Sequence, residues 1–142
     1  MAVTDPVVSL GEVLSEKTPV ERRMWAAFRL GELGRPQAIP ALILALADHE
    51  LSVQGRAAAA LIRIGTSAVA AITQSATEAS GKVQHYATAI LGYIGGQEEI
   101  ATLQSIADES NDEIVLTIAK HSIELINSFN RPASDFVELA NL

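Results

Sequence analysis

The segment Val53–Gly65, VQGRAAAALIRIG, decides the fold of this chain. Its alanines and aliphatic residues recur at the spacing of one helix face, and it ends in glycine, a residue that commonly terminates helices. Related segments start about thirty or thirty-one residues apart, namely RRMWAAFRLGELG at 22–34, VQHYATAILGYIG at 83–95 and IVLTIAKHSIELI at 114–126. A fixed period of this size indicates stacked helical repeats.

Aligning the four segments places small or aliphatic residues in shared columns. The first column contains Ala26, Ala57, Ala87 and Ile118; the second, within one position, Leu30, Leu61, Leu91 and Ile123; the third Leu33, Ile64, Ile94 and Leu125. Glycine closes three of the four segments, at Gly34, Gly65 and Gly95. We expect the first column to mark where helices approach most closely, because the distance between packed helices depends on the side chains at their contact.

A second amphipathic pattern precedes each segment, so the sequence predicts about eight helices in four antiparallel pairs joined by short loops. One pair cannot bury its apolar face alone, and stability then comes from stacking the pairs. The predicted fold class is all-α, a right-handed α-solenoid of four helix pairs in a single domain. The repeats span about 5–34, 35–65, 66–95 and 96–126, and a short C-terminal tail follows at 127–142.

Local signals predict several helix ends. Asp5 followed by Pro6 is typical of a helix start, with the proline at the first helical position. Thr18, with Glu21 three residues later, predicts a capping box for the next helix. Ser52 is expected to cap the alanine-rich helix that follows it.

The tail contains one further helical pattern, at Ser134–Leu139. We expect Phe136 and Leu139 to fold back over the last repeat. They would then cover the apolar face that a terminal repeat otherwise exposes.

Composition excludes several classes of function. The 142-residue chain has no cysteine, which removes disulfides, thiolate catalysis and cysteine-bound metals. The N-terminus lacks the pattern of a signal peptide, and no apolar run approaches the roughly eighteen residues of a membrane span. A net charge of −7 disfavours nucleic-acid binding, because cationic side chains supply most of the affinity for phosphates. We therefore expect a cytoplasmic protein with protein partners, no nucleic acid and no membrane span.

The negative charge lies in the C-terminal half. Residues 1–65 contain seven acidic and seven basic side chains, whereas residues 66–142 contain ten acidic and three basic ones. The candidate acidic patch consists of Glu98, Glu99, Asp108, Glu109, Asp112 and Glu113. It is interpreted either as a solvated face or as a binding surface for a basic partner.

The second helix of each pair also carries a row of side chains off its apolar stripe. Successive columns of this row contain Trp25, Arg56, Tyr86 and Thr117; Phe28, Ala59, Ala89 and Lys120; and Glu32, Arg63, Tyr93 and Glu124. Second helices normally line the concave side of a solenoid, and aromatic and arginine side chains dominate binding hot spots. The predicted partner-binding residues on the concave face are Trp25, Phe28, Arg56, Arg63, Tyr86 and Tyr93. The alternative is that Trp25 and Phe28 only cover the end of the stack.

The segment Arg35–Gly65 combines a helix opening Ala-Ile-Pro-Ala-Leu, a short acidic turn and an alanine-rich helix ending Ile-Gly. With the junction GELGRP at 31–36, this pattern resembles the HEAT-like repeats of the phycobilisome-lyase type. The resemblance extends over about residues 6–126 and is weakest at the two ends. It implies four HEAT-like helix pairs. In that family an arginine usually follows the valine of the second helix, whereas this chain has Gln54 and Gln84.

The family that this chain resembles includes subunits that attach bilins to phycobiliproteins, phycobilisome-degradation factors and bacterial scaffold proteins. The resemblance implies that the row could hold a tetrapyrrole, with Arg56 or Arg63 pairing with a propionate. Tyr86 or Trp25 would then stack on the rings. A bilin would be the bound group and a phycobiliprotein the partner. The chain is short for such a lyase, which usually needs two related chains.

The three histidines do not predict a metal site. Some HEAT-like enzymes bind two iron ions through several His-Glu pairs on successive repeats, and this chain has one such pair, His49-Glu50, in a turn. One pair cannot supply the ligands of a two-metal centre. His85 and His121 lack a carboxylate at ligand spacing and are expected at the surface. Neither a nucleophile elbow nor a phosphate-binding glycine loop is present, so no catalytic residue is assigned.

Two functions from different classes follow. The first is a non-catalytic protein-interaction module, a scaffold or chaperone that grips its partner with the concave row and needs no cofactor. The alternative is a subunit of a phycobilin lyase, or a bilin-handling factor associated with phycobilisomes. The absence of assigned catalytic residues favours the first, and mixing the protein with a bilin separates the two by colour.

Overall fold

The computed structural model describes residues 4–15 and 17–129. These residues form eight α-helices, two short 3-10 turns and no strand. The helices are α1 (Pro6–Val13), α2 (Val20–Leu33), α3 (Ile39–Ala45), α4 (Leu51–Ile64), α5 (Val69–Glu78), α6 (Gly81–Ile94), α7 (Gln97–Glu109) and α8 (Glu113–Phe129); the 3-10 turns are η1 (Pro36–Ala38) and η2 (Gly65–Ala68). The helix expected at 134–139, with Phe136 and Leu139, lies outside the described residues.

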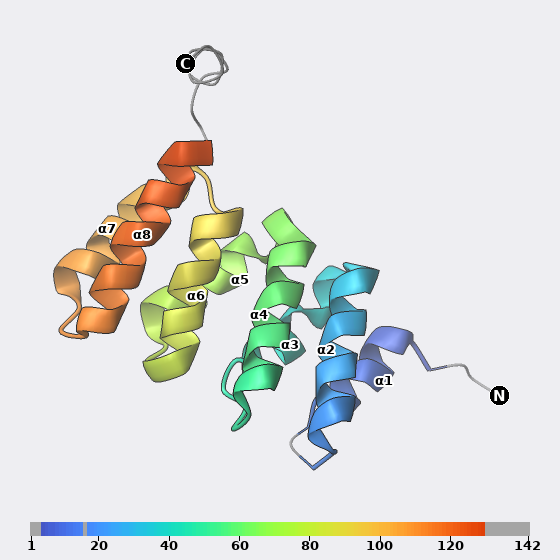
Figure 1. Cartoon of the computed structure of the whole chain (residues 1–142). Helices are drawn as coiled ribbons and strands as arrows, with labels where there is room; N and C mark the ends of the chain where they lie inside the picture. Colours follow the sequence, from blue (N-terminus) through green and yellow to red (C-terminus); the bar gives the residue numbers. More distant parts are fainter. Residues whose placement is uncertain (1–3, 16, 130–142) are drawn as a thin grey trace, which may run out of the picture.

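The helices stack as four pairs, α1/α2, α3/α4, α5/α6 and α7/α8. Figure 1 shows two layers, with the second helices α2, α4, α6 and α8 in front and the first helices behind them. Each pair contacts the next mainly through its second helix, α2 against α4 and α6 against α8. The prediction of an all-α solenoid of four helix pairs is confirmed.

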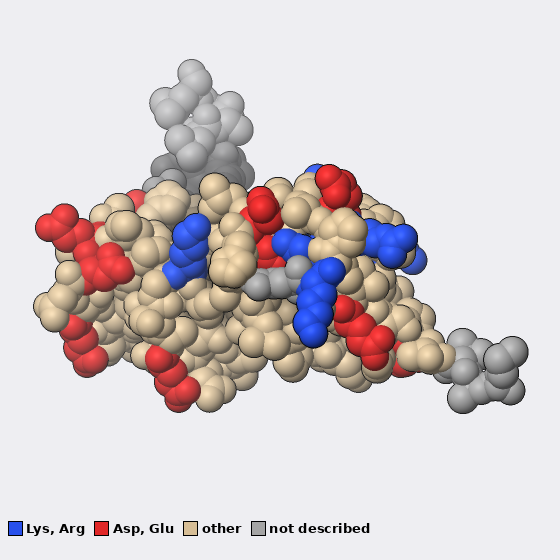
Figure 2. Space-filling model, turned by 90° about the horizontal axis from the view of Figure 1, so that it is seen from below, with Lys and Arg blue, Asp and Glu red and all other residues tan. Residues whose placement is uncertain are grey.

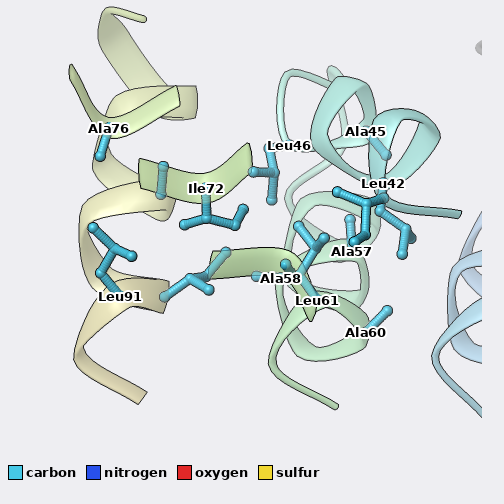
Figure 3. Close-up of a cluster of buried hydrophobic side chains, with 14 of the residues drawn as sticks. Leu42, Ala45, Leu46, Ala57, Ala58, Ala60, Leu61, Ile72, Ala76 and Leu91 are labelled. Carbon is cyan, nitrogen blue, oxygen red and sulfur yellow. The ribbon is translucent and has the colours of Figure 1, made fainter. Parts of the chain in front are cut away.

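One continuous core runs through the stack. The first-column alanines of three repeats and the second-column leucines beside them are fully buried, namely Ala26, Ala57, Ala87, Leu30, Leu61 and Leu91. Figure 3 shows how the middle of this core is filled: Ile72 of α5 lies between Leu46, the residue after α3, and Leu91 of α6. Because the buried residues are small or aliphatic, the helices pack with little aromatic volume between them.

The fourth repeat is displaced by one residue from the predicted alignment. Ala119, and not Ile118, is fully buried at the alanine position of α8, while Ile118 is only half-buried. The loop between α7 and α8 has three residues, 110–112, whereas the loop between α5 and α6 has two, 79–80. This extra loop residue shifts the column, so the predicted place of Ile118 is wrong.

The predicted start of α1 is confirmed and that of α2 is wrong. Asp5 Oδ1 accepts a hydrogen bond from the Val7 backbone N–H at 2.8 Å, as expected of a helix cap. The hydroxyl of Thr18 instead donates to the carbonyl oxygen of Val13 at 2.6 Å, and α2 begins only at Val20 without a side-chain cap. Thr18 therefore closes the end of the first helix.

The start of α4 also differs from the prediction. Ser52 lies inside α4, which begins at Leu51, so it is not the cap. The preceding turn is held by Asp48, whose Oδ1 accepts from the Glu50 backbone N–H at 2.9 Å. Asp48 is almost completely buried, which ties the start of α4 to the core rather than to a surface hydroxyl.

Two glycines inside helices allow neighbouring repeats to approach closely. A Cβ atom added to Gly31 of α2 would lie 2.9 Å from the Cα atom of Ala60 in α4, and one added to Gly92 of α6 would lie 2.9 Å from that of Ser122 in α8. The same repeat position in α4 is occupied by Ile62. Correspondingly, α4 and α6 make far fewer backbone contacts than the pairs on either side of them. The middle junction is the loosest on the second-helix side.

The helical stretch Leu51–Glu78 is long and apolar enough, by length and composition alone, to cross a membrane. It is not one straight helix: Gly65 has φ 79 and ψ −137, and the chain turns there through η2 into α5. A span requires one helix whose backbone groups are satisfied along its length. In this fold the two halves belong to different helix pairs.

Candidate interaction surface

The six predicted partner-binding residues lie on α2, α4 and α6. Trp25 and Phe28 of α2 are 56% and 43% exposed, and Tyr93 of α6 is 53% exposed. Arg56 and Arg63 are exposed on α4, whereas Tyr86 is half-buried and packs against the core. More than half of the Trp25 surface is therefore open to solvent.

A shallow cavity of about 240 Å³ lies between α2 and α4. Its lining comes from Met24, Trp25, Phe28 and Arg56, so it combines two exposed aromatic rings with one guanidinium group. Aromatic faces and an arginine fork together provide apolar contact area and directed hydrogen-bond donors.

A second cavity, of about 290 Å³, lies where α4, α6 and α8 meet, and we call it the α4–α6 groove. It is lined by Leu51, Gln54, Lys82, His85, Tyr86, Ala89 and Ile118. Arg56 and Tyr86 occupy equivalent repeat positions but border these two neighbouring cavities separately. The sequence row is thus divided by α4 into two depressions rather than forming one.

The two central second helices are basic in an acidic chain. Helices α4 and α6 contain Arg56, Arg63 and Lys82, all exposed, and no Asp or Glu. Within residues 4–15 and 17–129, none of these three side chains takes part in an ion pair. Figure 2, which views the stack from below, shows acidic side chains crowded at the end formed by the last repeat and most basic ones toward the opposite end.

Arg23 of α2 and Gln54 of α4 occupy equivalent repeat positions, and both side chains are buried against Asp48. Arg23 of α2 is buried and donates from Nε to Asp48 Oδ2 at 2.9 Å and from Nη2 to Asp48 Oδ1 at 3.0 Å, which bridges the first two repeats. Gln54, its equivalent in α4, is 2% exposed and donates from Nε2 to the carbonyl oxygen of Asp48. Its Oε1 has no hydrogen-bond partner among the described residues.

Three carboxylates of the acidic patch accept hydrogen bonds within α7 or at the starts of α7 and α8. The Glu99 carboxylate accepts from the Gly96 backbone N–H at 2.6 Å, and Asp108 Oδ1 accepts from Gln104 Nε2 at 2.9 Å. Asp112 Oδ1 accepts from the Ile114 N–H at 2.9 Å. Glu98 and Glu113 stand in the first turns of α7 and α8, where negative charge favours the helix, and Glu109 is exposed at the end of α7.

Asp112 also pairs with His85, which sequence reasoning placed at the surface without a carboxylate. Asp112 Oδ2 lies 2.7 Å from His85 Nε2, joining the third and fourth repeats, and His85 is half-buried. The hydrogen bond from His85, with those from the Ile114 and Val115 backbone, lowers the pKa of Asp112 below its ordinary value of 3.8. Loop residue 112 and helix residue 85 are far apart in sequence, which is why spacing rules did not find the pair.

The lowered pKa of Asp112 predicts a pH dependence of stability. A carboxylate with a lower pKa in the folded state contributes stability above its unfolded pKa and loses it as pH falls through the folded value. We expect Asp112→Asn to show a shallower loss of stability than the unmodified protein as pH falls below about 4. Urea unfolding at a series of acidic pH values measures this, with Asp108→Asn as control. Equal slopes for Asp112→Asn and the unmodified chain would contradict it.

Within the described residues no cluster of three or more His, Cys, Asp or Glu side chains is arranged to hold a metal ion. A further cavity, of about 380 Å³, lies between α1 and α3 on the first-helix side and is lined mainly by small and apolar residues. Its lining contains no histidine and only one carboxylate, that of Asp48, whereas the cavities on the second-helix face combine aromatic and cationic side chains.

Comparison with known families agrees with this geometry. The profile described as HEAT repeats matches residues 7–89, which run from the start of α1 into α6 and make up more than half of the chain. No curated protein matches the sequence. HEAT repeats commonly mediate protein–protein interaction, and the helix pairs, the buried alanine columns and the exposed second-helix face are all features of such repeats. The chain belongs to the HEAT-repeat family.

Proposed function

We propose that this protein is a non-catalytic interaction module, a scaffold or chaperone, that binds a partner protein through the face formed by α2, α4 and α6. The observation that carries the proposal is the exposure of Trp25, Phe28 and Tyr93 on the helices that also carry three exposed cationic side chains, none of which forms an ion pair within the described residues. Large exposed aromatic side chains beside arginine are typical of binding surfaces rather than of inert ones. The acidic last repeat would deter acidic partners from docking at the wrong end.

Arg56→Ala and Tyr86→Ala should each weaken partner binding while the fold is kept. Arg56 is exposed in the cavity between α2 and α4, and Tyr86 lines the α4–α6 groove. Loss of a hot-spot side chain typically costs about 2 kcal/mol or more, which is about thirtyfold in affinity. The partner is first captured from native cell extract and identified by mass spectrometry; binding isotherms of the purified pair then give the affinities.

Thr117→Ala is the matched control for these variants. The sequence alignment assigned Thr117 to the same row, but the one-residue displacement of α8 gives the equivalent position to Ile118. Thr117 is exposed on α8, and its hydroxyl donates to the Glu113 carbonyl oxygen of its own helix. It should bind like the unmodified protein, and circular dichroism should show all three variants folded. If both test variants bind normally while charge reversal of Glu98, Glu99, Asp108 and Glu109 removes binding, the acidic patch is the binding surface.

The second candidate function, a phycobilin lyase subunit or bilin-handling factor, is tested in the same series. Trp25, Phe28 and Arg56 share one cavity, which is the combination of stacking faces and cation that a bilin propionate and its rings require. Mixing the purified protein with a bilin should leave the absorbance band of the bilin unchanged if the interaction-module proposal holds. A shifted band that disappears in Arg56→Ala would favour the bilin function, with a phycobiliprotein as partner.

A further inference from the structure

The α4–α6 groove exists because the middle junction is built differently from its neighbours. Gly31 and Gly92 let α2 meet α4 and α6 meet α8 with a separation that no Cβ atom would permit. Ile62 occupies the equivalent position in α4, and its branched side chain packs at the edge of the core. A large side chain between two helices sets them farther apart. The second helices therefore part at this junction and leave a depression lined by the start of α4, by residues 82–89 of α6 and by Ile118 of α8.

Gln54 leaves a polar atom at the base of this depression. The residue is 2% exposed and borders both the α4–α6 groove and an adjoining cavity of about 330 Å³ that reaches the loop at 47–49. Its Nε2 donates a hydrogen bond to the carbonyl oxygen of Asp48, whereas its Oε1 has no hydrogen-bond partner among the described residues. A buried acceptor without a donor is destabilising, so the polar packing around Gln54 is incomplete at this junction.

Charge at the groove is positive. Lys82 lines both cavities, is exposed and takes part in no ion pair within the described part of the chain. Of the nearby carboxylates, Asp48 is paired with Arg23 and Asp112 with His85. Glu50, at the start of α4, is the exposed exception. Neither α4 nor α6 contains an acidic residue. A carboxylate of a binding partner that enters the groove would therefore meet Lys82, and Arg56 lies in the neighbouring cavity between α2 and α4.

We propose that the α4–α6 groove binds an acidic amphipathic segment of the partner protein. An apolar side chain of that segment enters between Tyr86, Ala89 and Ile118. A carboxylate of the same segment, a few residues away from that apolar side chain, pairs with Lys82. A volume of about 290 Å³ lies at the lower limit of small-molecule pockets, which suits one anchoring side chain. The inference rests on the proposed function and names the chemical class of its partner.

The test is selection of phage-displayed random peptides on the full-length protein, followed by fluorescence anisotropy with the selected peptides. We expect the selected peptides to be enriched in aromatic or aliphatic residues next to Asp or Glu. Lys82→Glu should weaken their binding by at least about tenfold, whereas Lys120→Glu, an exposed lysine of α8, should not. Ala89→Glu should block the groove, and Ala59→Glu, one repeat earlier, should leave binding intact. Circular dichroism confirms that each variant is folded.

The outcomes separate this inference from the proposed function. Two results would overturn the proposal for the groove but leave the proposed interaction face intact. The first is selection of basic peptides. The second is selection of peptides that bind Lys82→Glu and Ala89→Glu as tightly as the unmodified protein but lose affinity for Trp25→Ala. Selected peptides whose affinity does not change with substitutions in either cavity also overturn the proposal for the groove, as does a selection with no enrichment over the Ala89→Glu protein. If the captured natural partner in addition binds Arg56→Ala and Tyr86→Ala as tightly as the unmodified protein, the proposed function of the α2, α4 and α6 face is overturned too.

Discussion

Gly31→Ala is expected to destabilise the fold by roughly 1–3 kcal/mol, although alanine is the better helix former. The new methyl group would lie 2.9 Å from the Cα atom of Ala60 and 3.0 Å from its Cβ atom. Backbone cannot rotate away as the end of a flexible side chain can, so α2 and α4 must separate. Separation loosens the contact between the first two repeats along its whole length.

Gly55→Ala is the matched control, because it makes the same chemical change in an open place. Gly55 is exposed in α4, and an added Cβ atom would meet nothing within 4 Å. Replacing glycine in a helix interior stabilises by roughly 0.5–1 kcal/mol. Urea unfolding of the two variants should therefore shift in opposite directions from the unmodified protein. A stabilised Gly31→Ala would show that α2 and α4 are not in close contact.

Arg23→Ala is expected to cost about 3–5 kcal/mol, the range found when one partner of a buried ion pair is removed. Arg23 and Asp48 are 6% and 3% exposed, and two hydrogen bonds of 2.9 and 3.0 Å join them. Without the guanidinium group the Asp48 carboxylate would stay buried without its counter-charge. The same carboxylate accepts from the Glu50 N–H, so the turn before α4 would be weakened too.

A double-mutant cycle with Asp48→Ala measures the coupling between the two side chains. Because each single change strands the other charge, the double variant should be clearly more stable than the sum of the single effects indicates. The exposed pair Arg29–Glu32, with its atoms 3.0 Å apart on α2, is the control, and Arg29→Ala should cost less than about 0.5 kcal/mol. Additive effects for Arg23 and Asp48 would contradict the interaction.

The fold could be predicted from the sequence because the same pattern of apolar residues recurs in each repeat. Ala26, Ala57 and Ala87 recur at nearly constant spacing, and all three are fully buried. The predictions were wrong where the number of residues between repeats changed, or where one side chain could form hydrogen bonds with either of two helices. One additional loop residue before α8 moved Ala119 into the column assigned to Ile118, and periodicity cannot count loop residues. Thr18 could cap the next helix or close the previous one, and the structure uses the second option.

The candidate surface was predictable only in part. Exposure of Trp25 and Tyr93 followed from their offset from the apolar stripe. The division of the row into two cavities did not follow, because it depends on the distance between neighbouring helices. A signal was present in the sequence all the same: Ile62 stands where two other repeats have glycine, and that contrast marks the junction that opens.

The most direct test of the second-helix face is site-specific photocrosslinking in native cell extract. A photoreactive residue is placed at Phe28 or Tyr93 on that face, at Leu44 on the first-helix side, or at Asp108 in the acidic patch; all four positions are exposed. We expect one partner to crosslink at Phe28 and Tyr93, with the band lost when Arg56→Ala is added, and no specific band at Leu44 or Asp108. Crosslinks confined to Asp108 or Leu44, unaffected by Arg56→Ala, would contradict binding by the face of α2, α4 and α6.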